Sequence, residues 1–257
     1  MRVAGRHVVV TGAAGGIGAA LARRFAAEGA AAVVCADVDE ASLRRVAAGI
    51  GATAVVCDVR DAGAVAALVE SAEAQHGPID LFCSNAGVAI PGGPDAPEEA
   101  WRASIEINVM AHVHAARVLV PRMIERGGGY LLQTASAAGL LTQLGSAPYS
   151  VSKHAAVAFA EWLAITYGDR GLKVSVLAPQ AVRTAMTAGV PGGGVAGVDG
   201  MLEPDDVAEA VVRGLEAESF LILPHPQVLE YFRRKAADYD RWIRGMQRLQ
   251  QRFAPPG

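Results

Sequence analysis

The sequence lacks the features that mark membrane, secreted and nucleic-acid-binding proteins. It has no apolar run of the roughly 18 residues that a membrane-spanning helix needs. Its formal net charge is −3 over 257 residues, so no strong field of one sign draws it to nucleic acid or to acidic membranes. The first residues run directly into a strand pattern, without a signal or transit sequence. We therefore expect a cytoplasmic protein that works without a membrane or a nucleic acid.

Cysteine and metal-binding patterns are also scarce. The three cysteines, Cys35, Cys57 and Cys83, each fall in a predicted strand and show no Cys-x-x-Cys spacing. Such thiols are typical of small core residues in a reducing compartment. The six histidines show no ligand spacing beyond His112-x-His114, whose side chains point apart on a helix. We expect buried free thiols and no metal site.

The hydrophobic pattern alternates between short β-branched runs and longer helical stretches. Strands are predicted at 7–12, 32–37, 53–58, 80–85, 130–134, 173–177 and 220–223. Helices are predicted at 17–28, 62–75, 98–126 with a bend at Pro121, 149–167 and from Glu203 onward. This alternation predicts a single doubly wound Rossmann-type α/β domain with a seven-stranded parallel sheet. We place that catalytic domain at residues 1–225.

Two segments do not follow the alternation. Residues 185–203 are rich in glycine without clear periodicity, which is typical of a substrate lid or a disordered segment. Residues 226–257 are a basic helical tail of the same domain, which we expect to pack near the substrate entrance of its own subunit or of a neighbour. Binding of the tail to a membrane or a nucleic acid is the less favoured alternative. The predicted apolar stripe of the tail is Leu229, Phe232, Ala236, Tyr239, Ile243, Met246, Leu249 and Phe253.

A glycine-rich turn follows the first predicted strand and opens the first helix. It reads Gly12-Ala-Ala-Gly-Gly-Ile-Gly18, and its glycines let backbone N–H groups approach a pyrophosphate at a helix N-terminus. Asp37 ends the next strand, 19 residues beyond Gly18, near the spacing at which an acidic residue meets an adenosine ribose. The other role open to Asp37 is the N-cap of the helix that begins near Glu40. The strand–turn–helix context favours a dinucleotide site.

Polar and glycine residues gather at the carboxyl ends of the predicted strands, where parallel sheets bind ligands. They are Gly12, Asp37, Asp58, Asn85, Ser136 and Pro179. Tyr149 and Lys153, four residues apart, share one face of a helix that follows Ser136. A phenol ordinarily titrates near pH ~10, and a nearby ammonium lowers that pKa. With a hydroxyl from Ser136 to hold a substrate oxygen, these three groups predict a proton-transfer site.

On these residues the chain resembles the short-chain dehydrogenase/reductase family over about residues 5–224. Thr11-Gly12-Ala-Ala-Gly-Gly16-Ile-Gly18 fits that family's TGxxxGxG and also the TGxxGxxG of its extended branch. Asn85-Ala-Gly87 and the modest chain length favour the compact branch. The resemblance implies that Tyr149 is the catalytic acid/base, that Ser136 orients the carbonyl, and that Lys153 also binds the nicotinamide ribose.

The same resemblance implies further roles around the cofactor. Asp58 and Val59 would meet the adenine, and Thr184 would touch the nicotinamide amide. Asn108 would hold a helix kink and a water that joins Lys153 to solvent. The catalytic set is therefore Asn108, Ser136, Tyr149 and Lys153. The cofactor-binding set is Gly12, Gly16, Ile17, Gly18, Asp37, Asp58, Val59, Asn85, Ala86, Gly87, Tyr149, Lys153, Pro179, Val182 and Thr184.

The chain departs from the family pattern in two places. Gln180 stands after the sixth strand where the family commonly has glycine, and a side chain there would crowd the nicotinamide or project toward the substrate. Leu223-Pro-His-Pro226 and the tail replace the paired glycines near the family's usual end.

These observations predict an NAD-dependent oxidoreductase for a lipophilic secondary alcohol or its ketone. Asp37 would repel the 2′-phosphate of NADP. The expected pocket positions are mainly small or apolar: Ala137, Ala138, Leu140, Leu144, Gln180 and Val182. An idle NAD-binding sensor, or an epimerase or dehydratase on the same fold, is the alternative. The resemblance implies a homodimer or homotetramer built through the helices at 98–126 and 149–167.

Overall fold

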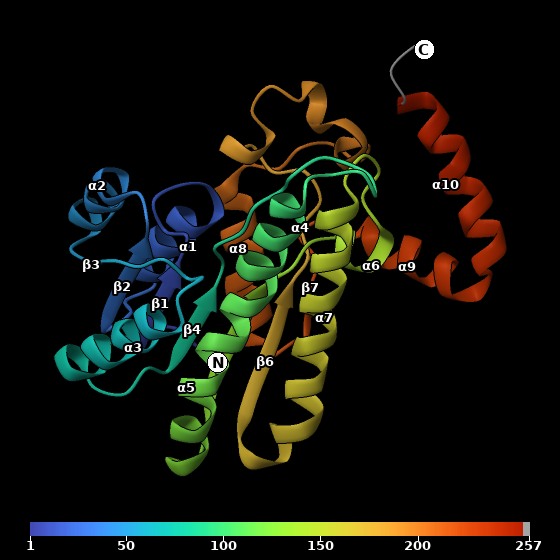
Figure 1. Ribbon diagram of the computed structural model, residues 1–257. Helices are drawn as coiled ribbons and strands as arrows, with labels where there is room; N and C mark the ends of the chain where they lie inside the picture. The colour runs from blue at the N-terminus through green and yellow to red at the C-terminus, as the bar shows by residue number, and fades with distance from the viewer. Residues whose placement is uncertain (254–257) are drawn as a thin grey trace.

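The protein is built on one sheet of seven parallel strands, and the computed structural model describes residues 1–253 (Figure 1). The strands are β1 (His7–Thr11), β2 (Ala32–Asp37), β3 (Thr53–Val56), β4 (Leu81–Ser84), β5 (Gly129–Thr134), β6 (Leu172–Leu177) and β7 (Leu221–Ile222). Their order is β3-β2-β1-β4-β5-β6-β7, so the chain winds outward from β1 first to β3 and then to β7. The predicted doubly wound Rossmann-type fold is confirmed.

Helices cover both faces of this sheet. One face carries α1 (Gly16–Ala27), α2 (Glu40–Ile50) and α8 (Pro204–Glu216), and the other carries α3 (Ala62–His76), α5 (Ala111–Glu125) and α7 (Ala147–Tyr167). Parallel strands joined by helices are buried on both sides, which explains their continuous apolar sequences. Val9 and Val10, neighbours on β1, accordingly belong to the two separate hydrophobic cores.

The long helix predicted at 98–126 is interrupted near Asn108, where the family resemblance implies a kink. α4 (Glu98–Ile105) leads into a π-helical turn at Glu106–Met110, and α5 then continues through Pro121 to Glu125. Such a widened turn carries one extra residue and often marks a functional site. Asn108, in the middle of the turn, is fully buried.

The glycine-rich segment at 185–203, which we call the lid, is folded. It contains 3₁₀ turns at Ala185–Thr187 and Pro191–Gly197. A parallel bridge between Val182 and Leu202 holds its two ends together. Gly192, Gly193 and Gly194 have φ values of 59°, 77° and 57°, which residues with a Cβ rarely adopt. The lid therefore uses its glycines to make compact turns above the strand ends.

The tail forms two helices, α9 (Gln227–Ala237) and α10 (Tyr239–Phe253), which meet at Asp238. Asp238 leaves the helical conformation at φ −155° and ψ 94°, and its carboxylate accepts a hydrogen bond from Arg241 N at 2.9 Å. It thereby caps the N-terminus of α10. α9 lies against α6 (Ala138–Leu141), while α10 extends away from the body of the protein (Figure 1).

Most of the predicted apolar stripe of the tail does not pack against the rest of this chain. Its members Leu229, Phe232, Ala236, Tyr239, Ile243 and Phe253 are exposed, while Met246 and Leu249 are partly covered. The residues that anchor α9 are instead Val228 and Lys235, both buried. The break at Asp238 explains the difference, because the two helices no longer share one face.

Among residues 1–253, no helix is both long and apolar enough to cross a membrane. Cys35, Cys57 and Cys83 are free thiols in the core. Within the same residues, no group of three or more His, Cys, Asp or Glu side chains is arranged to hold a metal ion.

Candidate active site

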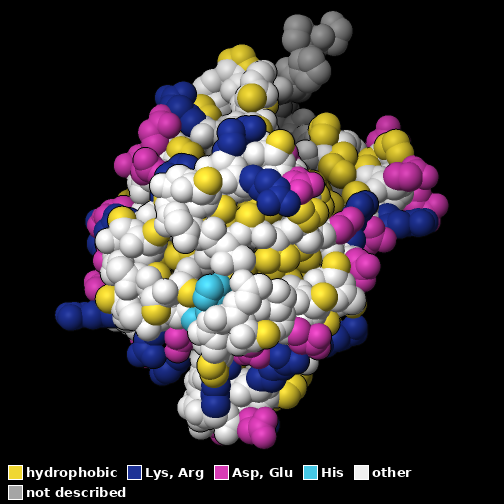
Figure 2. All heavy atoms as spheres, turned by 90° about the vertical axis from the view of Figure 1, so that its left-hand side faces the viewer, with side chains coloured by type: hydrophobic (Ala, Val, Ile, Leu, Met, Phe, Trp, Pro, Cys, Tyr) yellow, Lys and Arg dark blue, Asp and Glu magenta, His cyan; other side chains and the backbone are white. Residues whose placement is uncertain are grey.

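A large cavity runs along the carboxyl ends of the strands, between the sheet, the lid and the tail. Its volume is about 1450 Å³, which exceeds the ~300–1,000 Å³ of an ordinary small-molecule pocket. It therefore has room for a dinucleotide and a second molecule. From the side of α2 and β3, hydrophobic side chains form a band across the middle of the surface, with charged side chains of both signs around it (Figure 2).

Most of the predicted site residues line this cavity. They are Gly12, Gly16, Ile17, Asp37, Asp58, Val59, Asn85, Ala86, Gly87, Ser136, Tyr149, Lys153, Pro179, Val182 and Thr184. Gly18 and Asn108 do not line it, and each lies directly behind residues that do. The sheet thus brings together groups that are up to 172 residues apart in the sequence, from Gly12 to Thr184.

The glycine turn shapes one end of the cavity. Gly12 has a φ of +66°, and a Cβ there would lie 2.8 Å from Ala86 Cα. A Cβ on Gly18 would overlap the carbonyl oxygen of Gly12, so glycine lets α1 pack directly onto the end of β1. α1 begins without a side-chain cap and without an acidic residue in its first turn. Its free N–H groups and the positive end of its dipole suit a phosphate.

Asp37 lies at the same end, held by backbone donors. Its Oδ2 accepts a hydrogen bond from Ala14 N at 3.0 Å, and its Oδ1 accepts one from Asp39 N at 3.0 Å. Helix α2 is capped by Asp39, whose carboxylate accepts a hydrogen bond from Ser42 N. The alternative role of Asp37 as an N-cap is therefore wrong.

Arg60 is a cavity residue that the sequence analysis missed. It forms an ion pair with Asp58 at 2.6 Å, and hydrogen bonding within this pair lowers the pKa of Asp58. Both side chains line the cavity. The only signal in the sequence was an Asp-x-Arg spacing after the third strand, which by itself is too common to indicate a site.

Asn85 ties three strand ends together at the centre of the sheet. Its Nδ2 donates to the carbonyl oxygen of Thr11 at 3.1 Å, and its Oδ1 accepts a hydrogen bond from Thr134 Oγ1 at 3.1 Å. β1, β4 and β5 are thereby fixed relative to one another. Gly87 follows where space is tight, because a Cβ would lie 3.1 Å from Asn108 Oδ1 and 3.4 Å from Lys153 Nζ.

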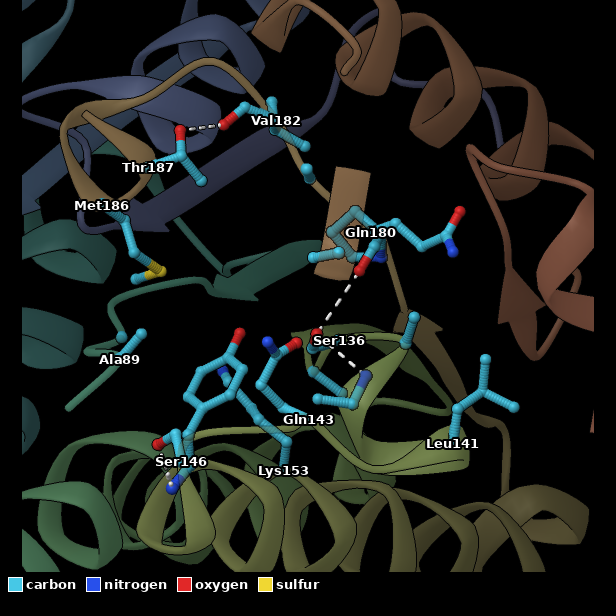
Figure 3. A pocket seen from close by; sticks show the side chains of 18 of the residues that line it. Ala89, Ser136, Leu141, Gln143, Ser146, Lys153, Gln180, Val182, Met186 and Thr187 are labelled. Carbon is cyan, nitrogen blue, oxygen red and sulfur yellow. Dashed lines mark hydrogen bonds between the residues drawn. The ribbon is translucent and has the colours of Figure 1, made fainter. Parts of the chain in front are cut away.

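Ser136 lies in the middle of the cavity, just after β5. Its Oγ accepts a hydrogen bond from Ala138 N at 3.1 Å and donates to the carbonyl oxygen of Pro179 at 3.4 Å. These bonds hold the hydroxyl in place. Ser136 and Lys153 point into the same space, and Met186 of the lid faces them from the opposite side (Figure 3).

Tyr149 and Lys153 come from the first turns of α7, which begins after the N-cap Ser146. The side chain of Ser136 lies near the phenol of Tyr149. Lys153 Nζ donates to the carbonyl oxygen of Thr134 at 2.9 Å and lies 5.8 Å from the centre of the Tyr149 ring. The predicted group of hydroxyl, phenol and ammonium is thus assembled in one place.

Burial acts on the phenol and the ammonium in opposite directions. It raises the pKa of Tyr149, although the neighbouring side chain of Ser136 opposes this, and it lowers the pKa of Lys153 to about 7. The pKa of Tyr149 is raised overall because the loss of hydration exceeds the opposing effect of Ser136. At neutral pH, burial therefore favours a protonated phenol beside a lysine that is easily deprotonated.

Asn108 fixes the π-helical turn from behind the cavity. Its Oδ1 accepts a hydrogen bond from Val88 N at 2.9 Å, and its Nδ2 donates to Val88 O at 2.9 Å and to Ser152 Oγ at 3.0 Å. The kink that the resemblance implies at Asn108 is therefore present. One turn later, His112 is also buried, and burial lowers its pKa to about 3, so its imidazole is neutral.

The two departures from the family pattern contact each other. Gln180 N donates to His225 Nδ1 at 3.2 Å, and His225 is buried in the segment that replaces the usual chain end. The side chain of Gln180 extends away from Ser136 (Figure 3). In this structure it does not enter the space in front of the catalytic candidates.

The remaining wall of the cavity comes from the lid and the tail, whose apolar side chains lie beside arginines of the tail. It includes Met186, Val190, Val195 and Val198 of the lid and Trp242, Met246 and Leu249 of α10. Leu141 lines the cavity where Leu140 was expected. The predicted positions Ala137, Ala138 and Leu144 do line it.

Comparisons with known proteins agree with this geometry. A family model described as short chain dehydrogenase matches residues 6–192. The 1-deoxy-11-beta-hydroxypentalenate dehydrogenase of Streptomyces exfoliatus is 42% identical over 231 residues, covering 86% of this chain and 84% of the relative. The cis-4-hydroxycyclohexanecarboxylate dehydrogenase of Sinomonas cyclohexanicum is 34% identical, covering 84% of this chain and 92% of the relative.

A solved structure extends the likeness to three dimensions. A short-chain dehydrogenase/reductase from Burkholderia phymatum in complex with NAD has a TM-score of 0.84 and 30% identity, covering 93% of this chain and 96% of that chain. The chain belongs to the short-chain dehydrogenase/reductase family. It is an oxidoreductase of that family, whose relatives here are dehydrogenases.

Proposed function

We propose that this enzyme interconverts a lipophilic secondary alcohol and its ketone with NAD(H), using Tyr149 as the acid/base. The observation that carries the proposal is the convergence of Ser136, Tyr149 and Lys153 in a cavity that also contains the glycine turn. Proton transfer and dinucleotide binding thereby share one space.

The residues at the glycine end fit NAD. The uncapped N-terminus of α1 would hold the pyrophosphate, and Asp37 would accept hydrogen bonds from the adenosine ribose. The carboxylate of Asp37 would repel a phosphate on that ribose. Lys153, Thr184 and the Asn85–Gly87 segment would lie around the nicotinamide half. NAD⁺, when bound, supplies the hydride acceptor.

The chain's own residues handle the proton. Ser136 Oγ would hold the substrate oxygen beside the phenol of Tyr149, which takes the hydroxyl proton during oxidation. Because burial raises the pKa of this phenol, the phenolate needs support from the ammonium of Lys153. Lys153 has a pKa of about 7, so it exchanges protons readily near neutral pH. The assignment of Asn108 to a water that joins Lys153 to solvent belongs to the same proposal.

The shape of the cavity supports an alicyclic substrate. The lid contributes aliphatic side chains to its wall and α10 contributes Trp242, and these apolar surfaces suit a hydrocarbon ring. Two relatives are named for dehydrogenation of a hydroxypentalenate and of a hydroxycyclohexanecarboxylate. We extend to this chain the class of substrate that these names share, a hydroxyl on an aliphatic ring.

The proposal includes a homodimer or homotetramer assembled through α5 and α7. α7 carries an exposed apolar row, Val151, Trp162 and Ile165, on the side turned away from the sheet. An exposed row of this kind on a helix outside the core is typical of a protein–protein contact.

The proposed chemistry is tested by replacing only the phenolic oxygen. Tyr149→Phe should lower kcat for alicyclic alcohols by about 10²–10⁴-fold, while calorimetry shows NAD⁺ binding near the wild-type affinity. A variant that keeps more than about a tenth of the rate would place the acid/base elsewhere. Nucleotide binding without turnover over a broad alcohol panel would favour the sensor alternative.

A further inference from the structure

α10 presents two parallel rows of side chains to the cavity. Trp242, Met246 and Leu249 make an apolar row, and Arg241, Arg248 and Arg252 make a basic row beside it. Steps of three, four and seven residues place each row on one face of the helix. Arg244, on the same helix, does not line the cavity. The cavity thus receives a specific subset of the tail's arginines.

The positive charge of this row is not balanced by the surrounding wall. Asp238, which lines the cavity beside this row, caps α10 through Arg241 N, and Asp240 does not line the cavity. Arg234 of α9 also lines the cavity, but it is paired with Glu230 at 2.8 Å. Within residues 1–253, Arg241, Arg248 and Arg252 form no ion pair. The other acidic residues of the cavity wall, Asp37 and Asp58, belong to the glycine-turn end.

The combination of an apolar wall and a basic rim describes an amphiphilic ligand. The protein as a whole has a net charge of −3, so the basic row is a local feature and not part of a general positive field. A guanidinium offers paired N–H donors that match the two oxygens of a carboxylate. The apolar row lies beside it in the same cavity and would cover the ring system of the same molecule.

We propose that the basic row of α10 binds a carboxylate of the substrate, so that the enzyme's substrate is a lipophilic hydroxy or oxo acid. This inference rests on the proposed function, because it orients the same substrate. The alcohol carbon reaches Ser136 and Tyr149, the ring packs against the lid and Trp242, and the carboxylate lies at the rim formed by Arg241 and Arg248. Specificity for the acid comes from the tail, far in sequence from the catalytic residues.

The test compares acids with their methyl esters, which differ only in the charged group. A graded series of 4-hydroxycyclohexyl carboxylic, acetic and butanoic acids and their esters would be assayed with NAD⁺. For the acid whose side chain is long enough to span the cavity, kcat/KM should exceed that of its methyl ester by roughly tenfold or more. This is the size expected for hydrogen bonds to a charged group. The Arg241→Gln/Arg248→Gln double variant should lose this preference through KM for the acid. High salt should weaken the preference in the wild type.

Arg244→Gln is the matched control, because it removes the same charge from the same helix outside the cavity. An equal loss with this control, or an acid-to-ester ratio near one at every length in the wild type, would overturn the inference. If no compound is oxidised, the proposed function fails. Calorimetry of acid and ester binding to the NAD⁺ complex then tests the carboxylate site separately. Preferential binding of the acid that the double variant loses supports it, and equal binding of acid and ester refutes it.

Discussion

At the scale of single residues, Asp37 and Asp39 have different tasks although they are two positions apart. Asp37 faces the cavity and is held by Ala14 N, whereas Asp39 caps α2. We expect Asp37→Ala to lower the ratio of kcat/KM with NAD⁺ to that with NADP⁺ by about 10–100-fold, because it removes a charged hydrogen-bond acceptor and a repulsion together. Steady-state kinetics with both cofactors measure this ratio.

Asp39→Ala is the control for that measurement. It should lower the stability slightly through the lost cap and leave the cofactor ratio unchanged. Equal use of both cofactors by the wild type, or a shift of the ratio with Asp39→Ala as well, would contradict the assignment of Asp37.

Burial of Lys153 leads to a prediction about how the stability of the protein depends on pH. Its pKa in the folded protein is lowered to about 7 from an ordinary value of 10.5, so folding disfavours its charged form. The stability of the wild type should therefore rise from pH 7 to pH 10.5, and the full cost of the buried charge applies below pH 7. Lys153→Met, without nucleotide, should raise Tm by roughly 3–6 °C at pH 6.5 and by much less at pH 9.5, as measured by calorimetry. An equal gain at both pH values would show that packing, and not charge, is responsible.

The residues that could be predicted are those fixed by local pattern. Gly12, Asp37, Ser136 and Tyr149 could be placed because parallel strands bring their carboxyl ends to one edge. The direction of the pKa shift of Tyr149 could not, because it depends on how much water the folded cavity excludes. Arg60 and the basic row of α10 were missed for a related reason. Their importance comes from facing the cavity, which only tertiary packing decides.

At the scale of elements, the tail divides into an anchor and a wall. α9 contains the buried Val228 and Lys235, and Lys235 Nζ donates to the carbonyl oxygen of Leu140 at 2.6 Å. α10 has no buried residue but lines the cavity. A chain that ends at Asp238 should therefore keep its Tm within about 2 °C, while KM for bulky alicyclic alcohols rises several-fold because an apolar wall is lost.

A chain that ends at Pro226 loses the anchor as well and should unfold several degrees lower. Thermal melts and kinetics with a small and a bulky alcohol separate the two effects. An unchanged KM for the bulky alcohol in the chain ending at Asp238 would leave α10 without a role in the cavity. A large loss of Tm in that chain would show that α10 stabilises the fold.

The elements themselves were predictable to within a few residues where hydrophobic periodicity was strong. The breaks within the helices could not be predicted from this periodicity. The helical spacing of apolar residues continues across Asp238, so periodicity alone could not show that the backbone leaves the helix there. Periodicity likewise did not show the π-helical turn at Glu106–Met110, because one extra residue per turn barely changes the pattern, and it was the family resemblance at Asn108 that indicated a kink there.

At the scale of the whole molecule, two exposed apolar surfaces compete to explain assembly. One is the row on α7, where Trp162 is 53% exposed and Ile165 is 83% exposed. The other is the outer face of the tail, where Ile243 is 47% exposed. α7 is held firmly by the sheet and lies beside the catalytic residues, whereas α10 stands off from the body (Figure 1). A rigid surface loses less conformational entropy when two copies associate, so α7 is the expected interface.

A single charged substitution on each surface decides between them. Ile165→Arg places an uncompensated cation in the α7 row and should dissociate the proposed homo-oligomer, because burial of an unpaired charge is costly. Ile243→Arg should leave the molecular mass unchanged. Light scattering at micromolar concentration, with circular dichroism to confirm folding, measures both. Dissociation by Ile243→Arg alone would move the interface to the tail, and a wild-type monomer would mean that neither surface assembles the enzyme.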